Sequence, residues 1–267
     1  MAGLFGSFYQ RLLNGEPLLD EVVIDAHMHI GKYHNFMIPS EGPAALIENA
    51  KRIGIKSMYG SSLLSIRNDA ISGNLMAIQV HQKYPGIFYP YLVAKPNYPE
   101  EIAQVIDGAV THNIRQFKIH DDGNGMAYDH HNYFPLYEYA NSVGGVILVH
   151  TYGAIHVRPT MAIAKQFTSL KILLAHSGII DEDIYYLAVR SCPNVFLETC
   201  NSWAWYGLIE RMVKNSGADR IGFGTDTPFM SPDQQIGRIL GAKITDDEKR
   251  QILGLNAERI FSSDKTG

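Results

Sequence analysis

Apolar residues along the chain fall into eight short runs, separated by longer segments in which apolar positions recur every three or four residues. Short runs without regular polar alternation are typical of strands that are buried on both faces. Spacing of three and four is typical of helices. The expected strands span residues 22–29, 55–62, 87–95, 114–120, 145–151, 171–178, 194–200 and 220–226.

The segments between these runs predict helices. The clearest spans residues 99–113, where a proline and two glutamates suit a helix start. One stripe of this helix contains Ile102, Val105, Ile106 and Ala109. Residues 135–144 and 161–167 have similar spacing. The stretch TDDE, beginning at Thr245, has capping-box spacing and predicts a last helix that runs through Phe261.

Strands that alternate with helices predict a parallel sheet. Eight such units in a chain of this length match the size of a (β/α)8 TIM barrel, and an open doubly wound sheet is the alternative. No linker-like stretch divides the chain. The sequence therefore predicts a leading segment over residues 1–21 and a single barrel domain over residues 22–267.

Composition and charge narrow the possible functions. The chain has 267 residues, of which 46% are hydrophobic and 19% charged, and its net charge is −4. This charge disfavours a general nucleic-acid binder, which needs a basic surface. No long uncharged apolar run predicts a transmembrane helix, and the N-terminus does not resemble a signal peptide. With only Cys192 and Cys200, we expect a cytoplasmic protein with free thiols.

Polar residues gather near the end of the first predicted strand. Side chains alternate across a strand, so Val23, Asp25, His27 and His29 are expected on one face. Two imidazoles about 7 Å apart along a strand can bind one ion. An ordinary strand with two chance histidines is the alternative interpretation of this stretch.

The later strands resolve this question, because the active site of a (β/α)8 barrel lies at the C-terminal ends of its strands. These ends carry His27 and His29, Lys118 and His120, His150, His176, Glu198 and Thr199, and Asp226. A polar group in an apolar strand is costly without a partner. The pattern therefore indicates that the two histidines of the first strand belong to a larger ring of functional residues.

Several motifs resemble a known family. They are IDAHMHIG in the first strand, FKIH in the fourth, ILVHTYG in the fifth, ILLAHSG in the sixth, IGFGTDTPF in the eighth and NAERIF in the closing helix. In this order they resemble the amidohydrolase superfamily, and within it the amidohydrolase-related group that includes metal-dependent decarboxylases. The resemblance extends over nearly the whole chain from Val22 onward.

The resemblance implies a role for each matching residue. His27, His29 and His150 would bind a divalent metal, and Asp226 would add an oxygen ligand and handle the proton of the attacking water. His176 would polarise the substrate or orient the water. Three imidazoles and a carboxylate suit one Zn²⁺, although Mn, Fe and Co also fit. Such an ion lowers the pKa of its water toward about 7.

The residues expected to contact substrate are Lys118, His120, Tyr152, Arg158 and Glu198. In two-metal members of the superfamily the fourth-strand lysine is carbamylated and bridges the ions. The FKIH setting resembles the one-metal group, so we expect one metal and a lysine that serves the pocket. Glu198 is alternatively an ion-pair partner inside the barrel.

The leading functional hypothesis is a metal-dependent hydrolase of a small amide, lactone or ester. The alternative is a decarboxylase or hydratase on the same site, although those decarboxylases typically hold a carboxylate with an arginine, and only Arg67 and Arg158 are candidates. A catalytically silent binding barrel is a third hypothesis. The expected partner is a small-molecule substrate. Relatives are often dimers, which makes a homodimer one assembly to expect.

Overall fold

Parallel strands alternate with helices through nearly the whole chain. The computed structural model describes residues 6–38, 42–122, 125–203 and 205–262. All strand pairs are parallel, and neighbours in the sheet follow the order of the chain. The strands are β1 (Ile24–Ile30), β2 (Ser57–Ser62), β3 (Phe88–Pro90), β4 (Leu92–Val93), β5 (Gln116–Ile119), β6 (Val146–Val149), β7 (Lys171–Leu174), β8 (Val195–Glu198) and β9 (Ile221–Gly222).

The third predicted strand, residues 87–95, is interrupted at Tyr91 and forms both β3 and β4. Pro90 has no amide hydrogen to continue the ladder. Tyr91 bridges the gap instead: its amide donates to the Gly60 carbonyl (2.8 Å), and its hydroxyl donates to the Ala26 carbonyl (2.8 Å). One predicted strand therefore becomes two, each paired with a different neighbour.

Backbone hydrogen bonds between β1 and the residues that follow β9 close the ring of strands. The Ala26 amide donates to the Phe223 carbonyl (2.9 Å), the Asp226 amide to the His27 carbonyl (2.7 Å) and the His29 amide to the Thr227 carbonyl (2.7 Å). The predicted (β/α)8 barrel is thus confirmed, and the open sheet is excluded.

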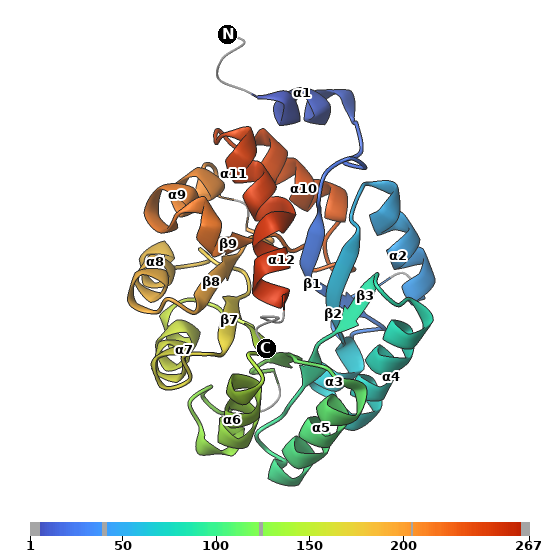
Figure 1. Ribbon diagram of the computed structural model, residues 1–267, viewed down its shortest axis with the longest axis vertical. Coiled ribbons are helices and arrows are strands. Elements are labelled where there is room, and N and C mark those ends of the chain that lie inside the picture. The colour runs from blue at the N-terminus through green and yellow to red at the C-terminus, as the bar shows by residue number, and fades with distance from the viewer. Residues whose placement is uncertain (1–5, 39–41, 123–124, 204, 263–267) are drawn as a thin grey trace.

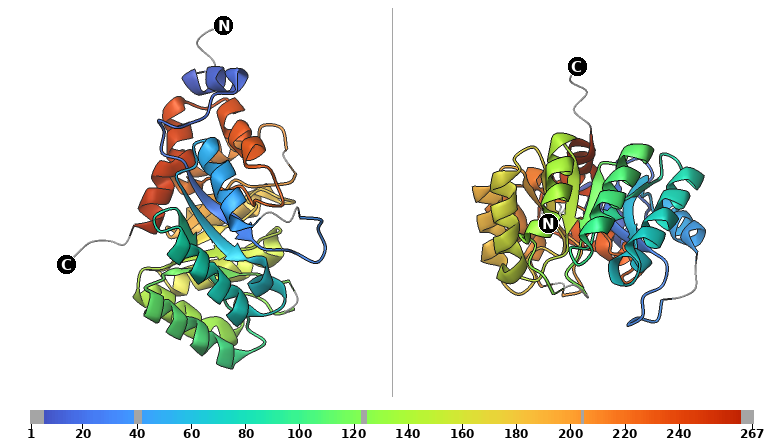
Figure 2. Two further views of the ribbon diagram at one scale, coloured as in Figure 1. Left: turned by 90° about the vertical axis from the view of Figure 1, so that its right-hand side faces the viewer. Right: turned by 90° about the horizontal axis from the view of Figure 1, so that it is seen from below.

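Helices surround the strands on the outside, apart from the last helix, which lies in front of the ring of strands (Figure 1). They are α1 (Ser7–Asn14), α2 (Pro43–Arg52), α3 (Leu63–Arg67), α4 (Ala70–Lys83), α5 (Pro99–His112), α6 (Phe134–Ser142), α7 (Ala154–Gln166), α8 (Glu182–Ser191), α9 (Leu208–Ser216), α10 (Pro232–Gly241), α11 (Asp246–Arg250) and α12 (Asn256–Phe261). Helix α1 lies at one end of the molecule beside α11 (Figure 2), where the Ser7 amide donates to Asp246 (2.7 Å).

The last helix begins as predicted, because Thr245 and Glu248 form a capping box. It is not uniform, however: a π-helical turn over Gln251–Leu255 separates α11 from α12. Gly254 lies in this turn, and a Cβ there would collide with the Val22 carbonyl oxygen. The turn therefore lets the closing helix pack directly against the start of the first strand.

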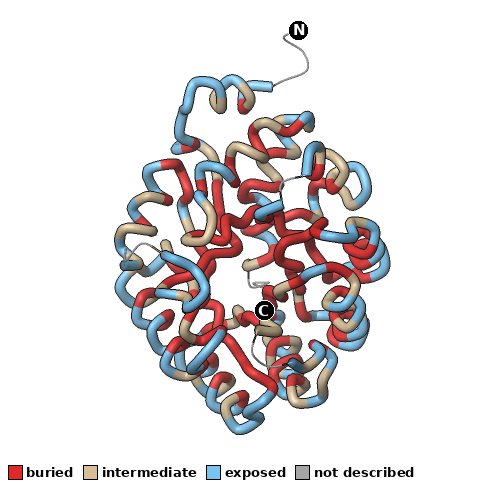
Figure 3. Tube along the Cα trace, turned by 180° about the vertical axis from the view of Figure 1, so that it is seen from behind, coloured by how far each residue is buried: buried red, intermediate tan, exposed pale blue. Residues whose placement is uncertain are grey.

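Buried residues occupy the ring of strands and the inner faces of the helices (Figure 3). Ile147 and Val149 pack beneath the helices, whereas Leu148 packs inside the barrel with Leu173. Both faces of β6 are thus apolar, as the unbroken sequence run predicted.

The expectation that Val23 shares a face of β1 with His27 and His29 is wrong. Val23 packs with the outer cluster, together with Met28, while Ala26 packs inside the barrel. The reason is a register shift between Asp25 and Met28, which interrupts the alternation of side chains along the strand. The shift therefore separates the part of the strand in which Ala26 faces inward from the part that carries His27 and His29.

Candidate metal centre and active site

Three buried side chains present donor atoms to one point. The His27 and His29 Nε2 atoms are 3.2 Å apart, and Asp226 Oδ1 lies 3.2 Å from His29 Nε2 and 3.5 Å from His27 Nε2. Ligand bonds of about 2.0–2.2 Å place neighbouring donors roughly 2.8–3.6 Å apart in tetrahedral or octahedral geometry. The three residues therefore fit a divalent metal ion.

Two residues of the site have a backbone conformation that is uncommon for side-chain-bearing residues. Asp226 has φ of +54° and His176 has φ of +58°. Such positive φ values cost free energy and persist where surrounding contacts enforce them, often at functional sites. The two predicted catalytic residues are therefore held in set positions by the local backbone.

Asp25 is one source of this constraint. Its carboxylate, only 1% exposed, accepts hydrogen bonds from the amides of His27 and Thr225 (3.0 Å each) and from the Thr225 hydroxyl (2.5 Å). Asp25 thus joins the strand that provides two histidines to the segment that provides Asp226. Asp25 was expected on the same strand face as the histidines, but with no predicted role.

Two opposing effects act on the pKa of the Asp226 carboxyl. Desolvation by burial raises the pKa of its carboxyl, but the hydrogen bond with His29 and the charges of His176, His29 and Lys118 outweigh burial and lower the pKa overall. Asp226 is therefore an ionised carboxylate at neutral pH. It can both bind a cation and accept a proton.

Lys118 lies deeper than a residue of the pocket wall. It is fully buried on β5, and its Nζ is 3.1 Å from His27 Nε2. Burial is the main reason that its pKa falls to about 8, although nearby Asp226 acts in the opposite direction. The predicted pocket lysine thus lies beside a metal-ligand candidate, and the expectation of one metal stays a prediction.

His150 and His120 form a second group. Their rings are stacked, with centroids 3.8 Å apart, and Asp121 completes a set of three donors that also approach one another closely. His156 donates from Nε2 to the Asp121 carboxylate (3.0 Å). His150 faces His176 as well, with ring centroids 4.9 Å apart. Its role as the third nitrogen ligand stays a prediction, because its ring lies against His120 rather than within the first donor set.

His176 contacts both parts of the site. Its ring centroid is 5.0 Å from that of His27, and its Nδ1 lies 3.3 Å from the carbonyl oxygen of Cys200. Burial lowers the pKa of His176 to about 4, although Asp226 acts in the opposite direction. His176 is therefore neutral near pH 7 and can accept a proton or a hydrogen bond.

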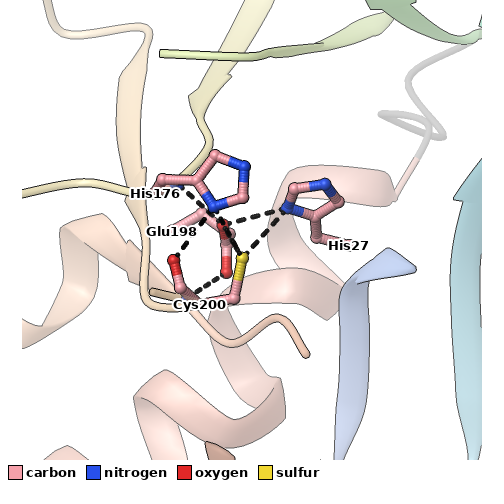
Figure 4. Close-up of side chains that lie close together, drawn as sticks. All are labelled: His27, His176, Glu198 and Cys200. Atoms are coloured by element: carbon pink, nitrogen blue, oxygen red, sulfur yellow. Dashed lines mark hydrogen bonds and ion pairs between the residues drawn. The ribbon is translucent and has the colours of Figure 1, made fainter. Parts of the chain in front are cut away.

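Beneath the donor set lies a cluster of His27, His176, Glu198 and Cys200 (Figure 4). Glu198 is fully buried there and does not line the cavity, in contrast to its predicted contact with substrate. Burial raises its pKa to about 8, against the opposing effect of hydrogen bonds from Cys200 and His176. Cys200 was not predicted as part of the site, although it lies two residues after Glu198, on the spacing that shares a strand face.

A cavity of about 400 Å³ opens onto the site. Tyr152 and His120, two of the predicted substrate contacts, line it, whereas Arg158 lies exposed on α7 and does not. The apolar wall of the cavity consists of Phe36, Leu63, Ile66, Ile179, Phe229 and Met230. The rings of Tyr33, Phe36 and Phe229 contact one another, and Phe229 reaches His29 with centroids 5.7 Å apart. The cavity therefore offers an aromatic wall directly beside the metal-ligand candidates.

One side of the cavity mouth is polar. Asp122 accepts hydrogen bonds from the Tyr33 hydroxyl and from the Arg67 guanidinium. Arg67, one of the arginines expected to hold a substrate carboxylate, is thus engaged by Asp122. Among the lining residues that the structure describes, none is an arginine or a lysine.

Comparisons with known proteins agree with this geometry. The family model described as Amidohydrolase matches residues 24–262. The fold is similar to 2,6-dihydroxybenzoate decarboxylase from Rhizobium, with 14% identity, a TM-score of 0.71, and coverage of 90% of this chain and 98% of that one. Comparison with curated proteins found no match.

Two other solved structures show the same likeness. Dihydroxybenzoic acid decarboxylase from Polaromonas sp. JS666, with bound manganese and the inhibitor 2-nitroresorcinol, is 16% identical with a TM-score of 0.73, covering 92% of this chain and 98% of that one. For 5-carboxyvanillate decarboxylase from Sphingomonas paucimobilis the values are 16%, 0.69, 90% and 98%. At these identities the likeness confirms the barrel fold.

No helix in the described part of the chain is long and apolar enough to cross a membrane.

Proposed function

Because this chain belongs to the amidohydrolase family, we propose that it is a metal-dependent decarboxylase of a small aromatic acid with a hydroxyl group beside its carboxylate. The observation that supports this most is the aromatic wall of Tyr33, Phe36 and Phe229 next to His29. A cavity of about 400 Å³ suits a single substituted ring. Hydrolysis was the leading hypothesis from the sequence, but the names of the structural neighbours support the decarboxylase alternative better.

We assign the metal to His27, His29 and Asp226, with His150 as a further predicted ligand. When bound, a divalent ion would polarise the oxygens of the substrate's carboxylate and hydroxyl groups. Three of the similar structures contain manganese. Manganese is therefore the first ion to test. Zinc, which was the expectation from the sequence, is the second.

In this proposal Asp226 handles the proton. Its ionised carboxylate accepts the hydroxyl proton of the incoming acid and returns it to the ring carbon that bears the substrate carboxylate. When the bond from that carbon to the carboxylate breaks, CO2 leaves and the bonding pair restores the aromatic ring. The phenolate then takes a proton from water. Neutral His176 accepts a hydrogen bond at the same side of the cavity and orients the acid.

Hydrolysis is the second candidate, and one observation favours it. The described lining of the cavity contains no cationic side chain for a carboxylate, and Arg67 is paired with Asp122. A neutral ester or lactone would need no such cation. The same ionised Asp226 could then take the proton of an attacking water.

The experiment loads the protein with Mn²⁺ and supplies 2,6-dihydroxybenzoate, 5-carboxyvanillate and their methyl esters, in parallel with an Asp226→Asn variant. We expect CO2 release from the free acids, no reaction of the esters, and strongly reduced release by the variant. Release of methanol from the esters, without CO2 from the acids, would identify a hydrolase and contradict the proposal.

A further inference from the structure

The carboxylate of Glu198 is the meeting point of four hydrogen-bond donors beneath the metal-ligand candidates (Figure 4). Its Oε2 accepts from His27 Nδ1 (3.2 Å), the His176 amide (3.1 Å) and the Cys200 thiol (3.0 Å). Its Oε1 accepts from the Cys200 amide. Four donors on one carboxyl group favour its ionised form, which only accepts hydrogen bonds, and so act against the burial that raises the pKa of Glu198.

These bonds determine which ring nitrogen of each histidine carries the proton. When His27 donates from Nδ1 to Glu198, the lone pair of its Nε2 faces His29 and Asp226. His176 likewise donates from Nδ1 to the Cys200 carbonyl (3.3 Å), which leaves its Nε2 without a proton. Metal-binding histidines commonly owe their orientation and tautomer to such a partner.

We propose that Glu198 is the positioning residue of the metal centre: it holds His27 as the Nδ1–H tautomer with Nε2 aimed at the ion, and it fixes the backbone of His176 above it. This inference rests on the proposed metal site. It gives Glu198 a role different from the substrate contact expected from the sequence.

Gly224 shows that the barrel is shaped around this contact. A Cβ at Gly224 would collide with Glu198 Oε1 and would lie 2.8 Å from the Cβ of His27. Glycine at this position therefore lets the carboxylate reach the histidine. Gly224→Ala consequently disturbs the same contact without changing either partner.

The side chains of His27, His176, Glu198 and Cys200 could instead hold a second cation, because their ligand atoms lie within 4.8 Å of one another. The hydrogen bonds argue against this alternative. Cys200 Sγ lies 3.2 Å from His27 Nδ1 and 3.3 Å from His176 Nδ1, but the thiol donates to Glu198 Oε2 (3.0 Å) and the Cys200 carbonyl accepts from His176 Nδ1 (3.3 Å). Hydrogen bonding thus accounts for these contacts without an ion.

The test measures Mn²⁺ affinity by titration against a competing chelator. Glu198→Gln places an NH2 group against at least one donor, and we expect its dissociation constant to rise about 10–100-fold. Glu198→Asp keeps the charge but withdraws it by one methylene, so an intermediate rise is expected, and Gly224→Ala should weaken binding as well. Glu182→Gln, a matched change in the ion pair with Arg211 on the barrel exterior, should bind like the wild type.

Three results would overturn the inference. Wild-type affinity in Glu198→Gln, with a loss of thermal stability alone, would show a merely structural role. A thiolate-to-metal charge-transfer band in Co²⁺-loaded wild type would show that Cys200 is a ligand. Nitrogen NMR of the metal-free wild type reads the tautomer directly, and a proton on His27 Nε2 would contradict the assignment even if every variant failed to fold. Absence of Mn²⁺ binding by the wild type would refute the proposed function but leave the tautomer measurement decisive.

Discussion

Replacing Asp25 with alanine tests how far one carboxylate stabilises the closing seam of the barrel, the contact between β1 and the segment that follows β9. The change removes the acceptor of the His27 amide, the Thr225 amide and the Thr225 hydroxyl. A buried donor without a partner costs about 1–3 kcal/mol. The two amides cannot turn to other acceptors, whereas the hydroxyl can rotate. We therefore expect Asp25→Ala to lower the free energy of unfolding by about 3–4 kcal/mol.

At about 2–4 °C per kcal/mol for a chain of this size, the Tm should fall by roughly 6–15 °C. The assay is urea and thermal unfolding of metal-free protein, followed by circular dichroism. Thr225→Val is the matched control: it removes the hydroxyl that donates to Asp25 and accepts from the Thr227 amide (3.1 Å), but it keeps both amide bonds to Asp25. It should cost about 1–3 kcal/mol, less than Asp25→Ala. An Asp25→Ala protein within 1 kcal/mol of the wild type would refute this reasoning about the seam.

Because the pKa of Asp25 is shifted, the difference in stability between the wild type and Asp25→Ala should depend on pH. Desolvation by burial raises it from 3.8 to about 7 in the folded protein, against the opposing hydrogen bonds from Thr225 and His27. Between these values the folded state binds a proton that the unfolded state releases, so this contribution to stability falls as pH rises. The stability gap between wild type and Asp25→Ala should therefore be smaller at pH 8 than at pH 5.

Three further predictions concern other parts of the molecule. Asp226→Asn should lose more activity than metal, with turnover down about 10²–10⁴-fold, because an amide still coordinates weakly but cannot accept the proton. Phe229→Ala should raise KM for the aromatic acids about tenfold with a smaller change in kcat, because a wall of the cavity is lost. Glu182→Gln should cost about 0.5–1 kcal/mol at pH 7. Arg211 lowers the pKa of Glu182 below its usual 4.5, so this difference should vanish as the pH falls through that lowered value, as unfolding curves at pH 7 and about pH 3 will show.

The fold followed from sequence because it depends on regular geometry. Each of the eight predicted runs contains at least one strand, and side chains at the C-terminal ends of parallel strands meet at one rim. This rule placed His27, His29 and Asp226 at that rim, and the family resemblance then selected them as ligands. The register shift in β1 was not predictable from alternation, because the paired strand determines where an extra residue is accommodated.

The parts of the site that sequence did not predict depend on contacts between different segments. Cys200 lies two residues beyond Glu198, but only the packed barrel shows that it also meets His27 and His176. The stacking of His150 on His120 depends on the side-chain conformations of two neighbouring strand ends. The choice between decarboxylation and hydrolysis depends on loop side chains such as Phe229, whose positions no periodic pattern encodes.

The most direct test of the account compares Mn²⁺ content and turnover in His27→Ala and His176→Ala. His27 supplies one of the three converging donor atoms, so its removal should empty the site and abolish activity together. His176→Ala leaves His27, His29 and Asp226 in place, so Mn²⁺ should largely remain while turnover on the responsive acid falls by about 10²–10⁴-fold. Elemental analysis alongside CO2 release makes the measurement. An empty site in His176→Ala, together with retained metal and activity in His27→Ala, would contradict the assigned roles.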